Sequence, residues 1–320
     1  MQVPDFWQRG NGGLASLLLA PLGWLYGAAG AVVWATARPW KAPVPVICIG
    51  NLVAGGAGKT PVALDMGNRL IARGRTVHFL SRGYGGSEPG PLRVDPSVHT
   101  SAAVGDEPLL LARVAPTWVA AERADGCRAA VLAGAQVIIM DDGFQNPAVA
   151  KDLALIVVDG GYGFGNGRIM PAGPLRQSVA SGLKRAQAVM VIGEDSGLDL
   201  PPSHPPIFKG SLRISPHNPD LAGQPVIAFA GIGRPQKFFE TLMQMGCDLR
   251  ARLSFADHHP YSAADLDRLR HQADQLNARL VTTEKDAVRL PPGFAGIVAI
   301  HVAWQDEAAI EALLDKVLKP

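Results

Sequence analysis

The stretch GNLVAGGAGKTP at Gly50–Pro61 decides the fold of this chain. An apolar run, Val44–Gly50, leads into it, and an amphipathic stretch, Pro61–Arg73, follows it. A glycine-rich loop between a buried strand and a helix lets backbone N–H groups approach phosphate oxygens, and the helix N-terminus adds favourable partial charge. This context predicts a phosphate-binding loop in an α/β protein rather than a structural glycine turn.

Two residues at the end of the loop carry its expected chemistry. Lys59 is expected to reach the β- and γ-phosphates of ATP, and Thr60 to place its hydroxyl on Mg²⁺. Val53 stands where the strict pattern G-x-x-x-x-G-K-[ST] has its first glycine, but the glycine-rich centre and the GKT triplet remain. The expected nucleotide-binding residues of the loop are Val53, Ala54, Gly55, Gly56, Ala57, Gly58, Lys59 and Thr60.

A second requirement of such a site is an acid that serves the metal at the carboxyl end of a neighbouring strand. The apolar run Gln136–Asp141 ends in the pair Asp141 and Asp142, which makes both residues candidate Mg²⁺ ligands. The run Leu153–Asp159 also ends in an acid. Asp159 precedes two glycines, however, so a surface turn explains it equally well.

Apolar runs and amphipathic stretches alternate along the chain after Pro45. Further strands are expected at Thr76–Ser81 and Ala188–Gly193, and further helices at Glu107–Val114 and Glu122–Leu132. Nearly continuous apolar strands separated by helices are typical of a doubly wound parallel sheet that is covered on both faces.

Residues 195–224 are rich in proline and predict a linker. A second alternating block of strands and helices follows it. Its strands are expected at Pro225–Gly231, Leu249–Phe255, Arg279–Thr283 and Ile297–Ala303. Its helices are expected at Pro235–Met245, Ser262–Ala278 and Glu307–Leu318. We therefore expect three parts: an N-terminal segment at residues 1–40, a P-loop kinase-like domain at 41–218, and a smaller C-terminal α/β lobe at 219–320.

The N-terminal segment concentrates the apolar character of the chain. Residues 10–37 carry no charged side chain, whereas the whole chain has 18% charged residues. This run is long enough for a membrane-spanning helix, and tryptophans near its ends suit a membrane interface. Pro21 and Gly23 leave open a helical hairpin within one leaflet. A buried core helix and a secretory signal peptide are the alternatives, and the nucleotide motif that follows argues against export.

Charge and cysteine usage exclude other classes. With 30 Lys and Arg against 28 Asp and Glu, the formal net charge is +2, which predicts no nucleic-acid partner. The three cysteines, Cys48, Cys127 and Cys247, are too far apart in the sequence for a metal motif or a disulfide framework and are expected to pack in the interior.

The remaining motifs narrow the kind of P-loop protein. A guanine-reading N-K-x-D segment is missing, since the nearest string, Thr283–Asp286, has the wrong order and spacing. A small-molecule kinase needs a base on the acceptor side, and Asp106 and His258 are candidates. Asp106 also suits a helix N-cap and His258 a structural contact between lobes, while His259 is expected to be structural.

Collinear strings along nearly the whole chain resemble the tetraacyldisaccharide 4′-kinases of lipid A biosynthesis, which are membrane-associated P-loop kinases of Gram-negative bacteria. The strings are PLGWLYG, GNLVAGGAGKTP, SRGYGG (Ser81–Gly86), VGDEPLLLA (Val104–Ala112), DDGFQN (Asp141–Asn146), MPAGPLRQ (Met170–Gln177), FAGIGRPQKFF (Phe229–Phe239), FADHH (Phe255–His259) and TTEKDAVRL (Thr282–Leu290).

The resemblance implies ATP-dependent phosphorylation of the 4′-hydroxyl of a tetraacylated glucosamine disaccharide 1-phosphate at the cytoplasmic face of the inner membrane. It implies that Asp106 is the catalytic base and His258 its partner, and that Arg123 and Arg176 lie near the reacting phosphates. It also implies the roles already expected for Lys59, Thr60, Asp141 and Asp142. The lipid substrate, rather than a protein, is then the main partner.

Two positions depart from the family pattern. Asn146 stands where a histidine is common, and Gln177 where a glutamate is more usual. A different class of function also stays open: a membrane-tethered P-loop ATPase or GTPase that acts as a switch on a protein partner. That alternative leaves the strings GDEP and DHH without a role.

Overall fold

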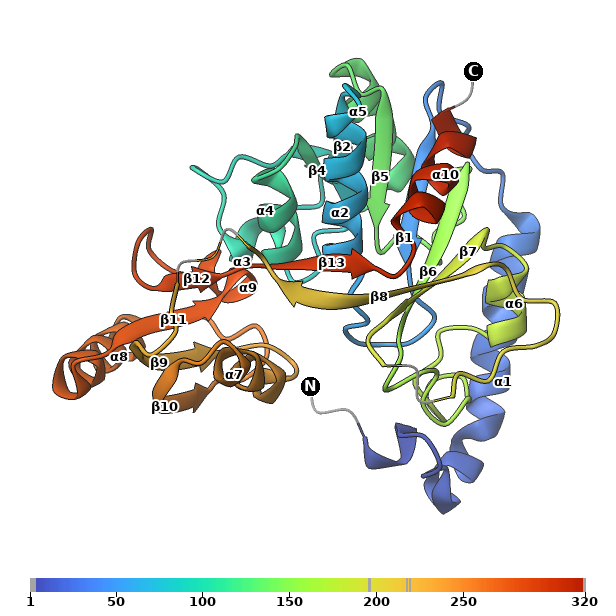
Figure 1. Cartoon of the computed structure of the whole chain (residues 1–320). Helices are drawn as coiled ribbons and strands as arrows, with labels where there is room; N and C mark the ends of the chain where they lie inside the picture. The colour runs from blue at the N-terminus through green and yellow to red at the C-terminus, as the bar shows by residue number, and fades with distance from the viewer. Residues whose placement is uncertain (1–3, 195–196, 217, 219, 319–320) are drawn as a thin grey trace.

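The structure, a computed structural model, describes residues 4–194, 197–216, 218 and 220–318 (Figure 1). Parts of three expected segments lie outside the described residues. In the N-terminal segment these are residues 1–3, and in the C-terminal lobe they are residues 319 and 320. In the linker they are residues 195, 196, 217 and 219, so the expected domain boundary between 218 and 219 also falls there.

A large, mostly parallel sheet forms the body of the described chain. Its nine strands lie in the order β13 (Ile300–Trp304), β8 (Ile207–Ile214), β7 (Ala188–Ile192), β6 (Leu153–Asp159), β1 (Val46–Gly50), β5 (Val137–Asp141), β2 (Val77–Ser81), β4 (Thr117–Val119) and β3 (Leu92–Arg93). All neighbours from β8 through β4 are parallel. Only the two edge strands, β13 and β3, pair in antiparallel fashion.

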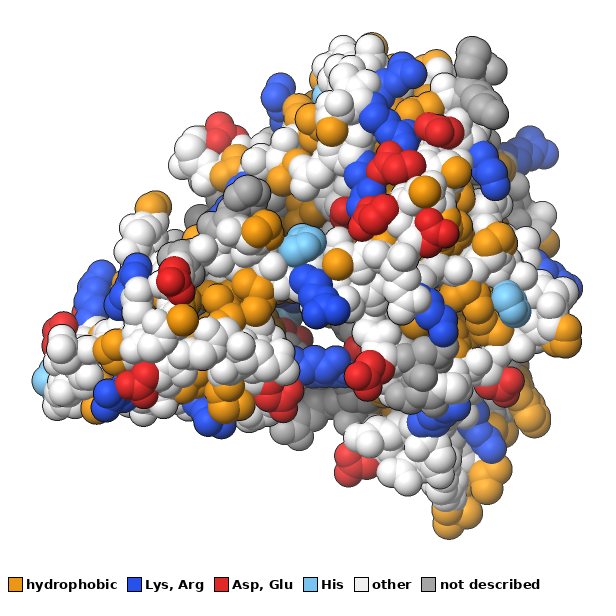
Figure 2. Space-filling model, in the orientation of Figure 1, with side chains coloured by type: hydrophobic (Ala, Val, Ile, Leu, Met, Phe, Trp, Pro, Cys, Tyr) orange, Lys and Arg blue, Asp and Glu red, His pale blue; other side chains and the backbone are white. Residues whose placement is uncertain are grey.

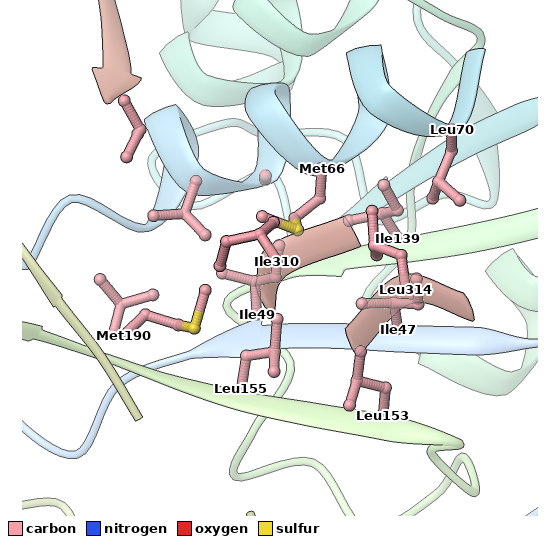
Figure 3. Close-up of a cluster of buried hydrophobic side chains, with 14 of the residues drawn as sticks. Ile47, Ile49, Met66, Leu70, Ile139, Leu153, Leu155, Met190, Ile310 and Leu314 are labelled. Atoms are coloured by element: carbon pink, nitrogen blue, oxygen red, sulfur yellow. The ribbon is translucent and has the colours of Figure 1, made fainter. Parts of the chain in front are cut away.

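Helices cover both faces of this sheet, so the predicted doubly wound α/β fold is confirmed. Side chains of β1 alternate between the faces: Ile47 and Ile49 belong to one buried cluster, and Cys48 belongs to the other. The first cluster includes apolar residues of α2 (Lys59–Ala72) and α10 (Glu307–Leu318), as Figure 3 shows. The second cluster includes residues of α5 (Arg123–Leu132) and α6 (Val179–Leu183).

Three short helical elements also belong to the body. They are the 3-10 helix η1 (Asp5–Trp7) and the helices α3 (Ser101–Val104) and α4 (Asp106–Ala112). The helix α4 packs against β4 and β2, which places its first residues at the carboxyl edge of the sheet.

A smaller lobe lies to one side of the body (Figure 1). Its sheet is entirely parallel, with the strand order β10 (Asp248–Ser254), β9 (Pro225–Ala230), β11 (Arg279–Thr283) and β12 (Gly296–Val298). Its helices are α7 (Pro235–Gln244), α8 (Ala263–Leu276) and the short α9 (Glu284–Ala287), which contacts α4 of the body.

The end of the chain differs from the expected lobe at 219–320. The single strand expected at Ile297–Ala303 is two strands: β12 closes the small sheet, and β13 pairs with β8 in the large one. Between them, the side chain of Asn218 binds both backbone groups of Ala299, at 2.7 and 2.8 Å. Residues 300–318 therefore return to the body, where α10 packs beside α2 (Figure 3).

The strand β8 was not expected, because its stretch of sequence lies in the proline-rich region interpreted as a linker. Most of its residues are exposed or half-buried, and only Gly210 is buried. A strand without an apolar face gives no periodic signal, so pairing with β7 and β13 determines it instead.

The N-terminal apolar run forms one continuous helix, α1 (Gly13–Thr36), which passes through Pro21 without a break. At about 1.5 Å per residue it is roughly 36 Å long. One narrow stripe faces the body: Ser16 donates a hydrogen bond to the carbonyl oxygen of Ala172, and Gly23 lies against the backbone of Ile169. In length and composition α1 is the candidate membrane span among the described residues, with a mean hydropathy of 1.6.

Candidate active site

The phosphate-binding loop joins β1 to α2 at the carboxyl edge of the large sheet. Gly58 ends the loop in a left-handed conformation, with φ of 86°, and α2 begins at Lys59. Gly55 is also left-handed, with φ of 115°, a conformation that favours glycine. A Cβ atom on Gly55 or Gly56 would meet nothing within 4 Å, so the loop backbone faces open space on this side.

Four side chains meet beside the loop: two from the start of α2 and two from the end of β5 and the residue after it. The Thr60 hydroxyl donates a hydrogen bond of 3.0 Å to Asp141 Oδ2, and Lys59 Nζ lies 3.6 Å from Asp142 Oδ1. Asp142 follows the last residue of β5 and has a φ of 57°, an uncommon conformation outside glycine. The structure thus brings together the expected lysine, threonine and aspartates.

The two aspartates differ in their electrostatics. Burial raises the pKa of Asp141 to about 7, although Lys59 acts in the opposite direction. Burial would also raise the pKa of Asp142, but the charges of Lys59 and Arg176 outweigh it and hold that pKa below its ordinary value. A buried carboxyl group with a raised pKa needs a cation before it is stable as a carboxylate.

This donor set fits Mg²⁺. Asp141 Oδ1 is buried and has no hydrogen-bond partner in the described part of the chain. Mg²⁺ prefers oxygen ligands, and in nucleotide sites one or two carboxylates and the phosphates commonly hold it. The described residues contain no cluster of three or more acidic, histidine or cysteine side chains that could hold a metal alone.

The two expected arginines lie in different surroundings. Arg176 Nη1 is 3.1 Å from Asp142 Oδ1 and 3.3 Å from Gln145 Oε1, which places Arg176 in the site. Arg123 is buried, and its Nη1 donates to the backbone carbonyl oxygens of Ala120 and Ala121. These two hydrogen bonds hold Arg123 within its own turn, and its Nε is a buried donor without a partner in the described part of the chain. The charge of Asp142 acts on the pKa of Arg123, so the guanidinium lies within electrostatic reach of the site.

Asp106 and His258 meet across the two lobes. Asp106 is the first residue of α4 and is 4% exposed, while His258 lies in the loop after β10 of the small lobe. The distance from His258 Nδ1 to Asp106 Oδ2 is 2.7 Å. The N-cap of α4 is Gly105, and the Asp106 side chain makes no capping hydrogen bond, so the N-cap alternative for Asp106 is not what the structure shows.

His259 behaves differently from its neighbour. Its ring packs against Phe255 and Tyr261, and its Nε2 lies 3.0 Å from Asp265 Oδ2. These contacts lie within the small lobe, in agreement with the structural role expected for His259.

Three residues around the Asp106–His258 pair were not singled out in the sequence. Lys285 Nζ lies 3.3 Å from His258 Nε2 and 3.0 Å from Glu107 Oε1. Arg289 is 3% exposed, and its Nε lies 3.5 Å from Asp106 Oδ2. Lys285 and Arg289 are four residues apart in TTEKDAVRL, which is the spacing of one helical turn and the only signal that could have paired them.

These contacts define the state of the histidine. Lysine has only hydrogen-bond donors, so in the neutral form of His258 the Nε2 atom accepts from Lys285 and the proton on Nδ1 points to Asp106. The hydrogen bond to Asp106 raises the pKa of His258, and burial and Lys285 act against that rise. In addition, Glu107 contributes to the raised pKa of Asp141, so the start of α4 lies within electrostatic reach of the aspartates at the loop.

Asp159, the alternative acid, joins the lobes instead. Its Oδ1 accepts from the backbone N–H groups of Gly161 and Tyr162, which makes the predicted turn. Its Oδ2 lies 2.9 Å from Arg234 Nη1 and 3.8 Å from Lys237 Nζ at the start of α7. Figure 2 shows a hollow between the small lobe and the body, with acidic and basic side chains at its rim.

Comparisons with known proteins agree with this geometry. A family model described as tetraacyldisaccharide-1-P 4′-kinase matches residues 15–319. A tetraacyldisaccharide 4′-kinase of Rhodospirillum centenum is 54% identical over 327 residues, which cover 99% of this chain and 97% of that one. A tetraacyldisaccharide 4′-kinase of Gluconacetobacter diazotrophicus is 54% identical over 326 residues, 98% of each chain.

A solved structure shares the fold. The crystal structure of the "apo" form of LpxK from Aquifex aeolicus in complex with ATP is 25% identical and superposes with a TM-score of 0.78. The match covers 96% of this chain and 100% of the other.

Proposed function

Because the chain belongs to the tetraacyldisaccharide-1-P 4′-kinase family, we propose that its phosphate-binding loop and its Asp106–His258 pair together carry out the family's reaction. The protein is a kinase that uses ATP to phosphorylate the 4′-hydroxyl of tetraacyldisaccharide 1-phosphate, a step of lipid A biosynthesis. The alternative of a P-loop switch acting on a protein partner is not favoured.

The nucleotide side of the site is assigned to residues 53–60. Backbone N–H groups of the loop bind the phosphate oxygens of ATP, and Lys59 offsets the charge of the β- and γ-phosphates. Thr60, Asp141 and Asp142 would hold Mg²⁺, which neutralises phosphate charge when bound. Arg176, fixed by Asp142, adds a further positive charge on the same side. Arg123 keeps its expected place near the reacting phosphates, because the charge of Asp142 acts on it and its Nε is a buried donor without a partner among the described residues.

The acceptor side is assigned to Asp106, and the 2.7 Å contact with His258 is the observation that carries this assignment. His258 and Arg289 approach Oδ2, and no described residue hydrogen-bonds Oδ1. Oδ1 is thus available to the sugar hydroxyl and accepts its proton as the oxygen attacks the γ-phosphate. The bond between the γ-phosphorus and the oxygen that bridges it to the β-phosphate breaks, and ADP leaves. His258 orients the carboxylate, and Lys285 and Arg289 hold the pair from the small lobe.

The division of the chain follows from this assignment. The N-terminal segment at residues 1–40 places the enzyme at the lipid, and the body at 41–218 carries ATP. The lobe after residue 218 contributes His258, and its chain returns to the body at β13.

The helix α1 is assigned to the cytoplasmic leaflet of the inner membrane, where the acylated substrate resides. Only about a tenth of the most apolar stretch of this helix is buried against the rest of the protein. Hydrophobic side chains gather along the edge that α1 forms (Figure 2). Its large exposed apolar residues are Leu14, Leu17, Leu18, Leu22, Trp24, Leu25, Tyr26, Val32 and Val33. One stripe of α1 thus contacts the body, and its apolar face is exposed. This arrangement is typical of a helix that lies in the membrane–water interface.

The proposed function is tested by phosphate transfer. Detergent-solubilised full-length protein is incubated with γ-labelled Mg-ATP and the lipid disaccharide 1-phosphate, and the label in the lipid is measured. We expect label at the 4′-position at a rate that depends on the lipid. Unlabelled lipid, with ATP hydrolysis stimulated by a protein instead, would support the switch alternative.

A further inference from the structure

A cavity of about 160 Å³ lies between the last turn of α1 and the body. This volume is several times the ~30 Å³ that one water molecule occupies in the liquid. Two rings, Trp34 and Phe144, and two cations, Lys151 and Arg185, are among the side chains that line it. The assignments made above for the reaction use none of these four residues.

The two cations have no acidic partner in the described part of the chain. Lys151 Nζ donates to the carbonyl oxygens of Asn146 and Val149, at 2.5 and 3.3 Å. Arg185 donates from Nη2 to Gln177 Oε1 at 2.6 Å and from Nη1 to Ser181 Oγ at 3.4 Å. Both carbonyl and amide oxygens are neutral, so two positive charges remain uncompensated.

Burial makes this arrangement costly without an anion. Burial lowers the pKa of Lys151, and the nearby charge of Arg185 lowers it further. Burial also lowers the pKa of Arg185, and its Nε is a buried donor without a partner. Gln177 Nε2 is a second buried donor without a partner in the described residues. Groups of this kind are satisfied by an anion with several acceptor oxygens.

The rings fix where this cavity lies. The Arg185 guanidinium carbon is 4.0 Å from the centre of the Trp34 ring and 5.5 Å from that of Phe144. Lys151 Nζ lies 5.2 Å from the Trp34 ring. Tryptophan at the end of an apolar helix sits at the level of lipid headgroups. The cavity therefore opens where lipid phosphates are found.

The cavity also adjoins the active site. Phe144 is two residues after Asp142, and Gln177, the partner of Arg185, directly follows Arg176, which binds Asp142. The same two segments, residues 142–146 and 176–177, thus contribute to the active site and to the surroundings of the cavity.

We propose that Lys151 and Arg185, against the ring of Trp34, bind a phosphate group carried by a membrane lipid. Two lipids carry such a group at this level: the substrate, through its 1-phosphate, and an anionic phospholipid of the leaflet. The first source rests on the proposed reaction, whereas the second rests only on the proposed placement of α1 at the membrane.

The test uses full-length protein with Lys151→Gln and Arg185→Gln combined. A matched control combines Lys184→Gln and Lys316→Gln, which removes two exposed charges outside the cavity. In the substrate arm, the KM is measured for the tetraacyldisaccharide with and without its 1-phosphate. In the vesicle arm, partition onto phosphatidylglycerol vesicles is compared with partition onto phosphatidylcholine vesicles.

We expect an effect of about tenfold or more, because hydrogen bonds to charged groups contribute roughly 1.5–3 kcal/mol. If the substrate is the source, the KM rises for the 1-phosphorylated lipid alone. If a phospholipid is the source, the cavity variant loses more of its partition onto phosphatidylglycerol vesicles than the control variant does. A cavity variant that matches the control in both arms would overturn the proposal.

Two further measurements keep the test decisive. Should the double variant not fold, Lys151→Gln alone is compared with Lys184→Gln alone, since Lys151 is bonded only to two backbone carbonyls. Should wild-type protein transfer no phosphate to either lipid, the proposed function fails, and the vesicle arm still decides whether the cavity binds a lipid phosphate.

Discussion

His258 Nδ1 lies 2.7 Å from Asp106 Oδ2, although the two residues are 152 positions apart and belong to different lobes. The small lobe therefore supplies one member of the pair, and the body supplies the other. The pair therefore exists only where the two lobes are docked. The ion pairs from Asp159 to Arg234 and Lys237 join the lobes at a second place.

Replacing Lys59 with alanine removes a positive charge that lies beside Asp142 and is expected to contact the γ-phosphate. We expect kcat/KM for ATP to fall by about 10²-fold or more, on the scale of a lost electrostatic contact in the transition state. Steady-state kinetics with saturating lipid measures this. Lys184→Ala, an exposed lysine outside the site, should be neutral.

Lys285→Met tests whether Lys285 positions His258. Because the Lys285 charge acts to lower the pKa of His258, its removal should raise that pKa further. NMR titration of the histidine ring measures the shift, and kcat should fall while the KM for ATP stays the same. A His258 pKa that is unchanged or lower would argue against the contact, and Lys285→Arg should restore part of the activity.

The His258–Asp106 hydrogen bond also predicts how stability depends on pH. The folded pKa of His258 is raised above its ordinary value of 6.5, so its stabilising contribution is full below that value and is lost as pH rises through the folded pKa. The difference in unfolding free energy between wild type and His258→Gln should therefore shrink as pH rises. Denaturant titrations between pH 5 and pH 9 measure it, and a difference that grows with pH would contradict the account.

The exposed face of α1 predicts the membrane behaviour. Leu18 and Leu25 are 72% and 68% exposed, so glutamate at both positions should leave the fold intact and weaken membrane binding. On insertion scales, a charged side chain at the bilayer centre costs about 2.5–3.5 kcal/mol. Sedimentation with vesicles measures the loss. Leu132→Glu is the control, because Leu132 is 88% exposed on α5 and outside this face.

Much of the fold could be predicted because its central strands are buried on both faces. The strands β6 and β11 begin and end where their apolar runs do, and the phosphate-binding loop fixes β1 and α2. The break at Ala299 could not be predicted, since it depends on the side chain of Asn218 from a distant segment. The local apolar pattern runs through it without interruption.

The candidate site divides in the same way. Lys59, Thr60, Asp141 and Asp142 follow local strand and loop signals, so the sequence alone could place them together. The contact between Lys285 and Glu107 could not be found in this way, because the two residues meet only when the lobes dock. Arg123 was expected near the phosphates from the family resemblance alone, and its hydrogen bonds to two backbone carbonyls could not be predicted, because they depend on the fold of the turn before α5.

The role of Asp106 as the base is the central claim, and the turnover of Asp106→Asn tests it most directly. Asparagine keeps the shape of the side chain and an oxygen that can accept from His258, but it cannot take up the proton of the sugar hydroxyl. We predict that kcat for the lipid falls by at least about 10²-fold, with the Kd for Mg-ATP unchanged. Turnover within a few-fold of wild type, at normal ATP affinity, would contradict the account.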